Sequence, residues 1–108
     1  MSHDPTARER AEQIARSVLG EQIGVVEATR AILPLLHSDC EIASPDDYNL
    51  FRGIDSETDD LPIGNVREEW DPAVLQEKDR EIARCENLWR EQVRNACERI
   101  LLRSSRIQ

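Results

Sequence analysis

Residues 71–102 read DPAVLQEKDREIARCENLWREQVRNACERILL, and this stretch decides the fold. Its apolar residues recur at spacings of three, four and seven, which is the period of one face of an α-helix. They are Leu75, Ile82, Cys85, Trp89, Val93, Ala96, Cys97, Ile100 and Leu101. The charged residues between them are typical of a solvated helix face. We therefore predict a long helix over residues 72–102, followed by a frayed tail over residues 103–108.

Helix starts are marked at three places, each a capping residue followed by proline: Asp4-Pro5, Ser44-Pro45 and Asp71-Pro72. The oxygen of the capping side chain accepts a bond from a helix N–H that has no partner within the helix. Proline has no backbone N–H, but at the first helical position the helix does not use that donor. The sequence therefore predicts three helices, one beginning at each pair.

A second long apolar stripe follows the first of these starts. Small or apolar positions alternate in steps of four and three: Ala11, Ala15, Val18, Gln22, Val25, Thr29, Ile32 and Leu36. This period predicts a helix over residues 5–36, with residues 1–4 frayed. Gly20 and Gly24 each weaken such a helix by about 1 kcal/mol relative to alanine. Pro34 should kink it or end it near Leu36.

About thirty residues join the two long helices, which is too many for a structureless loop in a compact domain. The pair Ser44-Pro45 predicts a short helix that runs to about Arg52. Gly53 is suited to close that helix in a left-handed conformation. Residues 54–64 contain proline, glycine and several acidic residues, which predicts a turn-rich segment.

Two helices of similar length joined by a folded connector predict an all-α fold, namely a long antiparallel helical hairpin. One hairpin buries one seam and leaves the other apolar flank of each helix in water. We therefore expect two hairpins to pair about a two-fold axis into a dimeric four-helix bundle, which makes the protein a homodimer.

Length and composition restrict the class of protein. A chain of 108 residues suits one domain, residues 1–108. Its 22 acidic and 14 basic residues give a net charge of -8, so we expect no nucleic-acid partner, because such partners require clustered Lys and Arg. No apolar run could span a bilayer and no signal peptide precedes the first helix, so we expect no membrane and a cytoplasmic location. Three cysteines without a CxxC pair predict reduced thiols.

The acidic connector, residues 55–70, contains the candidate binding residues: Asp55, Glu57, Asp59, Asp60, Arg67 and Trp70. Its alternating carboxylates resemble the start of a calcium-binding loop. However, Asp60 stands where that loop needs glycine, and Val66 where it needs a bidentate glutamate. The sequence therefore favours a solvated turn or a protein-recognition loop over a cation site. Trp70 would anchor the connector on the helices or serve as a binding hot spot.

Residues that could support catalysis or hold a metal ion are few. His37 and Cys40 have a spacing that would suit two zinc ligands, but a structural zinc site needs four. The predicted hairpin keeps Cys85 and Cys97 far from His37. The chain contains no glycine-rich phosphate loop, GxSxG elbow or HExxH pair. We therefore assign no catalytic residue, no metal and no cofactor.

Three functions agree with these features. The first is a small acidic protein-binding module, such as an adaptor, an inhibitor or an immunity-like neutraliser, which presents residues 44–70 or its acidic helix faces to a basic partner. The second is a small enzyme or ligand-binding dimer that uses the connector, and it requires Glu57, Asp59, Arg67 and Trp70 to converge. The third is a purely structural bundle subunit, which would expose a large apolar patch. We expect a binding protein rather than an enzyme.

Overall fold

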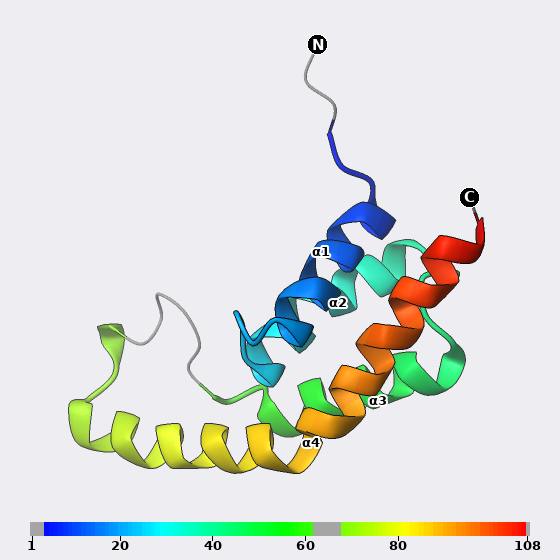
Figure 1. Ribbon diagram of the computed structural model, residues 1–108. Helices are drawn as coiled ribbons and strands as arrows, with labels where there is room; N and C mark the ends of the chain where they lie inside the picture. The colour runs from blue at the N-terminus through cyan, green and yellow to red at the C-terminus, as the bar shows by residue number, and fades with distance from the viewer. Residues whose placement is uncertain (1–3, 62–67, 108) are drawn as a thin grey trace.

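Four helices make up the described part of the chain, in a computed structural model that describes residues 4–61 and 68–107. They are α1 (Ala7–Leu19), α2 (Val25–Ser38), α3 (Pro45–Thr58) and α4 (Pro72–Ile107). The all-α prediction is confirmed, since these residues contain no strand. Figure 1 shows α1, α2 and α3 gathered against the C-terminal half of α4, whose N-terminal half extends away from them.

The three predicted helix starts are confirmed to within two residues. Ser44 Oγ accepts a hydrogen bond at 3.2 Å from the backbone N–H three residues further on, at the start of α3. Asp71 Oδ1 accepts one at 2.8 Å from the N–H two residues further on, at the start of α4. At α1 the cap is Thr6 rather than Asp4, and its hydroxyl accepts from the third N–H at 3.1 Å.

The prediction of one helix over residues 5–36 is wrong, because a tight turn separates α1 from α2. The N–H of Glu21 donates to the carbonyl of Val18 at 3.0 Å, and that of Gln22 donates to the carbonyl of Ser17 at 2.8 Å. This is the paired bonding that ends a helix through a left-handed residue. Glu21 is that residue, with φ of 57°. The two helices therefore fold back on each other, and a hairpin of two unbroken rods gives way to four helices.

The prediction that Gly53 closes the connector helix is also wrong. Helix α3 passes through Gly53 and continues to Thr58. Glycine inside a helix costs only about 1 kcal/mol. Burial of Phe51, Ile54 and Thr58 on one side of α3 offsets that cost. The short helix is therefore as long as α2.

Two other boundaries differ from expectation. Helix α2 continues through Pro34 and ends at Ser38, close to the predicted end. Helix α4 extends to Ile107, and Ser104 is buried, so residues 103–107 are helical rather than frayed. Residues 1–3 and 108, which belong to the predicted frayed ends, lie outside the described residues.

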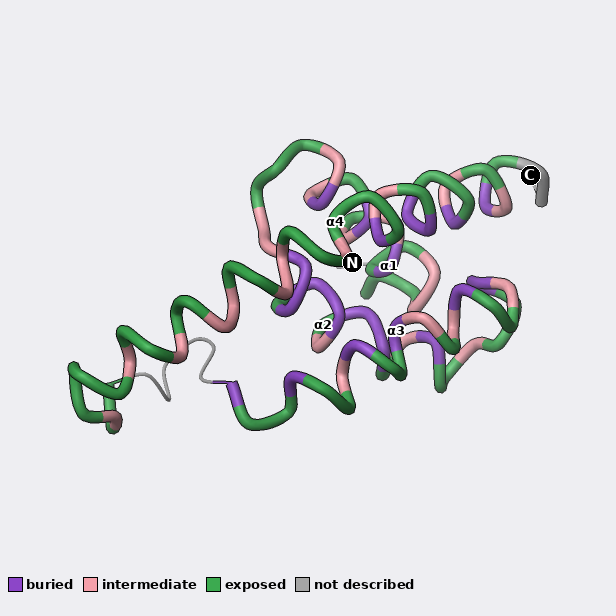
Figure 2. The backbone as a smooth tube through the Cα atoms, turned by 90° about the horizontal axis from the view of Figure 1, so that it is seen from below, coloured by how far each residue is buried: buried purple, intermediate pink, exposed green. Residues whose placement is uncertain are grey.

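The core lies between α1, α2, α3 and the C-terminal half of α4. Its members include Ala11, Ala15, Val18, Val25, Ala28, Ile32, Leu36, Ile42, Phe51, Ile54, Val93, Ala96, Cys97 and Ile100. Figure 2 shows one side of this half of α4 buried and the other exposed. The predicted apolar stripe of α4 thus faces the core from Val93 onward. Its earlier members are only half-buried: Trp89 packs against the edge of the core, and Leu75, Ile82 and Cys85 lie on the part of the helix that extends away from it.

Candidate functional site

The acidic connector holds most of the net charge of the protein. Residues 55–70 contain six carboxylates and one arginine, a net of -5 out of -8 for the whole chain. The exposed carboxylates in its described part are Glu57, Asp59, Asp60, Glu68 and Glu69. The connector begins in the last turns of α3 and ends where the arm of α4, residues 72–85, begins (Figure 1). A strong negative field therefore lies beside the part of the fold that projects furthest from the core.

Two of the candidate carboxylates on α3 face different parts of the protein. Asp55 is half-buried and lines a depression of 300 Å³ together with Arg30 and His37 of α2. Glu57 is exposed. Burial raises the pKa of the Cys85 thiol, and the negative charge of Glu57 raises it further. The structure therefore does not direct these two carboxylates into one site.

Asp60 interacts with the arm of α4. Its Oδ2 lies 3.1 Å from Lys78 Nζ, and this hydrogen bond and charge hold the pKa of Asp60 below its ordinary value. The same contact raises the pKa of Lys78. Both groups are accessible to water, so the pair adds little stability but fixes where the connector meets the arm. Trp70 is half-buried near the start of the arm, and Arg67 lies outside the described residues.

The start of α2 is capped by a side chain from α4. Glu86 Oε2 accepts a hydrogen bond from the N–H of Val25 at 2.6 Å, and Oε1 accepts one from Val26 at 3.3 Å. The N-cap residue, Gly24, has no side chain that could do this. A Cβ at that position would lie 2.5 Å from Glu86 Oε1. Glycine is therefore required here so that the carboxylate can reach the helix end.

Three arginines of α4 bind the ends of the other helices and turns. Arg94 Nη1 donates to the carbonyl of Leu19, the last residue of α1, at 3.2 Å. Arg99 forms a bidentate pair with Asp47 in the first turn of α3, with distances of 2.7 to 3.2 Å. Arg103 donates twice to the carbonyl of residue 41 in the turn between α2 and α3. Charged residues of α4 therefore hold together the ends of its neighbours.

The roles of Glu86, Arg94, Arg99 and Arg103 were not predicted from the sequence, because charges on an amphipathic helix are typical of a solvated face. One signal was available. Gly24 precedes the apolar residues of α2 and has no side chain that could cap this helix. The free N–H groups at the start of α2 therefore need an acceptor from elsewhere in the fold.

A pocket of 320 Å³ lies between the end of α2 and the start of α3. Its walls are Leu36, Ala43, Pro45 and Tyr48, with His37, Asp39 and Cys40 at its edge. Tyr48 Oη lies 3.0 Å from His37 Nδ1, and the two rings meet edge to face. This pocket has an apolar body and few polar groups, which suits a small ligand. Tyr48 was not a candidate on sequence grounds.

No protein-family model matches this chain, and neither curated proteins nor solved structures give a match. Within residues 4–61 and 68–107, no three His, Cys, Asp or Glu side chains gather in a way that could hold a metal ion. Among the described helices, none is both long and apolar enough to cross a membrane.

Helix α4 carries the large exposed apolar side chains of the described residues. In the described part of the chain, the large hydrophobic residues that are exposed are Val74 at 40%, Leu88 at 65% and Leu102 at 58%. All three belong to α4, and Leu88 and Leu102 are two heptads apart, so they lie on the same side of the helix. This side is opposite to the one that faces the core.

Proposed function

We propose that this protein is a protein-binding module that presents its acidic connector to a basic partner, as an adaptor, an inhibitor or a neutraliser does. The observation that supports this most is the concentration of net charge, -5 within residues 55–70. Lys78 neutralises Asp60 in part, whereas Glu57 and Asp59 are exposed and face solvent. A local field of one sign speeds the encounter with an oppositely charged partner and selects against acidic ones.

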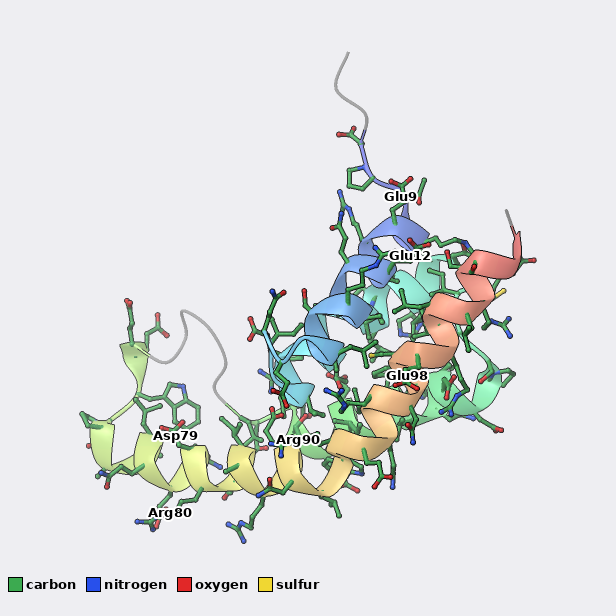
Figure 3. The ribbon with its side chains drawn as sticks, in the orientation of Figure 1. Glu9, Glu12, Asp79, Arg80, Arg90 and Glu98 are labelled. Carbon is green, nitrogen blue, oxygen red and sulfur yellow. The ribbon has the colours of Figure 1, made fainter. Side chains whose placement is uncertain are left out.

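The position of the connector also suits binding. Figure 1 shows the arm extending from the body of the protein, and Figure 3 shows Arg80 pointing away from that body on the arm. A partner could therefore contact the connector and the arm without disturbing the core. We further propose that the protein acts in the cytoplasm, which agrees with its three free cysteines.

To test this proposal, the protein is isolated from its host and native mass spectrometry identifies any partner that stays bound. The affinity for that partner is then measured in a binding assay. The connector variant Glu57→Gln/Asp59→Asn should weaken binding at least about tenfold at low salt, and less at high salt. The matched control, Glu27→Gln/Glu41→Gln, removes the same charge from exposed positions outside the connector and should change binding little. An acidic partner, or a loss of binding in the control alone, would overturn the proposal.

Ligand binding is the alternative function, and the observation that favours it is the pocket beside Tyr48 rather than the connector. Its apolar walls and its His37–Tyr48 hydrogen bond would accommodate a small ring with one polar group. A bound small molecule in the native mass spectrum, lost in a Tyr48→Ala variant, would support this alternative. The wild-type protein without any bound molecule would count against it.

We also propose that the protein is a homodimer that associates through α4. The large hydrophobic side chains that are exposed in the described part of the chain all lie on α4, and this is the observation that supports α4 as the contact. Sedimentation over a range of concentrations tests this directly. A mass that grows with concentration toward that of two chains is expected, and a constant monomer mass would refute it.

A further inference from the structure

The outer face of α4 consists of Leu88, Glu91, Asn95, Glu98, Arg99 and Leu102, and all six residues are exposed. Their spacings of three and four place them on one side of the helix. Figure 2 shows that this side points away from the other helices, and Figure 3 shows Glu98 on it. The opposite side carries the core residues Val93 and Ile100. The outer face is therefore free to contact another molecule along its length.

We propose that this face binds the same face of a second copy, with the two α4 helices antiparallel and a two-fold axis passing beside Asn95. This arrangement rests on the proposed homodimer and specifies how it is built. The sequence is self-complementary about Asn95, because Leu88 and Leu102 lie seven residues before and after it. Leu88 then packs on the partner's Leu102, and the same contact recurs on the other side of the axis.

Charge complementarity selects the antiparallel orientation. Four residues separate Asn95 from Glu91 and from Arg99, so Glu91 faces the partner's Arg99 twice in the dimer. Arg99 remains 53% exposed, and its bonds to Asp47 use only Nε and Nη2, which leaves Nη1 for the partner. A parallel pair in register would instead place Glu91 beside the partner's Glu91, and such like-charge contacts disfavour association.

Asn95 provides the register. Its amide group both donates and accepts, so two copies can bond to each other across the axis. A single Asn at the centre of two paired helices can specify their register. A pairing centred on Leu88 would require Val74 to reach the partner's Leu102. Figure 1 shows the arm running in a different direction from the C-terminal half of α4, so Val74 on the arm is not in line with Leu102 and that pairing is disfavoured.

The contact is short. A helical segment the length of residues 88–105 extends over about 27 Å. A seam of this length buries less surface than a standard protein interface, so we expect dissociation on the order of micromolar concentrations. Leu88→Lys should raise the dissociation constant about a hundredfold, because the change occurs twice in each dimer.

Cysteine cross-linking tests the geometry. In a background in which Cys40 and Cys85 are replaced by serine, Asn95→Cys should form a disulfide-linked dimer under mild oxidation, since it lies at the axis. Leu88→Cys and Leu102→Cys should each form no disulfide-linked dimer alone but should cross-link to each other when mixed. The control, Asn49→Cys, is exposed on α3 and should not cross-link.

The outcomes separate this pairing from the homodimer itself. If sedimentation shows a dimer but Leu88→Cys cross-links to itself and Asn95→Cys does not, the antiparallel pairing is wrong and the homodimer stands. If sedimentation shows only monomer, both are wrong. If Asn95→Cys and Asn49→Cys cross-link equally, the contact is random collision and the pairing is refuted.

Discussion

The contact between Glu86 and the start of α2 yields the most informative stability experiment. Glu86→Ala removes the two hydrogen bonds to Val25 and Val26, at 2.6 and 3.3 Å. Loss of a helix cap costs about 1 kcal/mol, and loss of a negative charge at the helix N-terminus adds a few tenths. We therefore expect the free energy of unfolding to fall by about 1.5 kcal/mol. Glu86→Gln keeps one acceptor and should lose less.

Gly24→Ala should cause a similar loss by a different route. Its Cβ would lie 2.5 Å from Glu86 Oε1, and a carboxylate at the end of a flexible side chain moves away rather than deforming the helix. Alanine is also a poorer N-cap than glycine. Once alanine at position 24 has displaced the carboxylate, the hydrogen bonds from Glu86 to the start of α2 are already lost. Replacing Glu86 as well should therefore cost little further stability.

A double-mutant cycle isolates this effect. Urea unfolding of the wild type, Gly24→Ala, Glu86→Ala and the double variant, followed by helical circular dichroism, gives four free energies. We expect the double variant to be about 1 kcal/mol more stable than the sum of the single losses implies. Additivity within about 0.3 kcal/mol would show that Gly24 and Glu86 act independently, and would refute the argument that glycine is there for the carboxylate.

Three further predictions concern single residues. Gly53→Ala should raise the free energy of unfolding by about 0.5–1 kcal/mol, because a Cβ there meets nothing within 4 Å, and a loss of stability in urea unfolding would contradict this. Asp47→Asn should lower the free energy of unfolding by about 2 kcal/mol, because Asp47 is buried while its partner Arg99 keeps access to water. An unchanged midpoint of urea unfolding would show that the ion pair adds no stability. The pKa of Asp60, measured by NMR titration, should lie below 3.8 in the wild type and rise toward 3.8 in Lys78→Gln. The folded-state pKa is lower than the unfolded one, so the contact with Lys78 stabilises the protein above pH 3.8. This stabilisation is lost as the pH falls through the folded-state pKa.

The sequence was informative where the signal is local. The capping pairs at Ser44 and Asp71 located two helix starts, because a side-chain oxygen and a proline act on the adjacent backbone. The core-facing residues of α4 from Val93 onward followed from helical period alone. These features depend on residues within one turn of each other.

The break between α1 and α2 was not predictable from periodicity. Val18 and Val25 keep the same spacing across the turn, so the apolar period continues although the helix does not. The turn depends on Glu21 adopting φ of 57°, which glutamate seldom does, and on Glu86, sixty residues away, binding the next helix end. Neither condition is visible in the local sequence. Likewise, the different directions of Asp55 and Asp60 depend on α2 and on the arm.

The capping contacts of α4 have a consequence for folding during synthesis. Helix α2 needs Glu86, α1 needs Arg94, and Ser104 bonds to Glu12, ninety-two positions earlier in the chain. A nascent chain that has emerged only as far as α3 therefore lacks the side chains of α4 that cap the start of α2 and bind the end of α1. Such distant contacts slow folding relative to a bundle with neighbouring helices. These three contacts can form only after residues 86–104 have been synthesised, so the four-helix core closes late in synthesis.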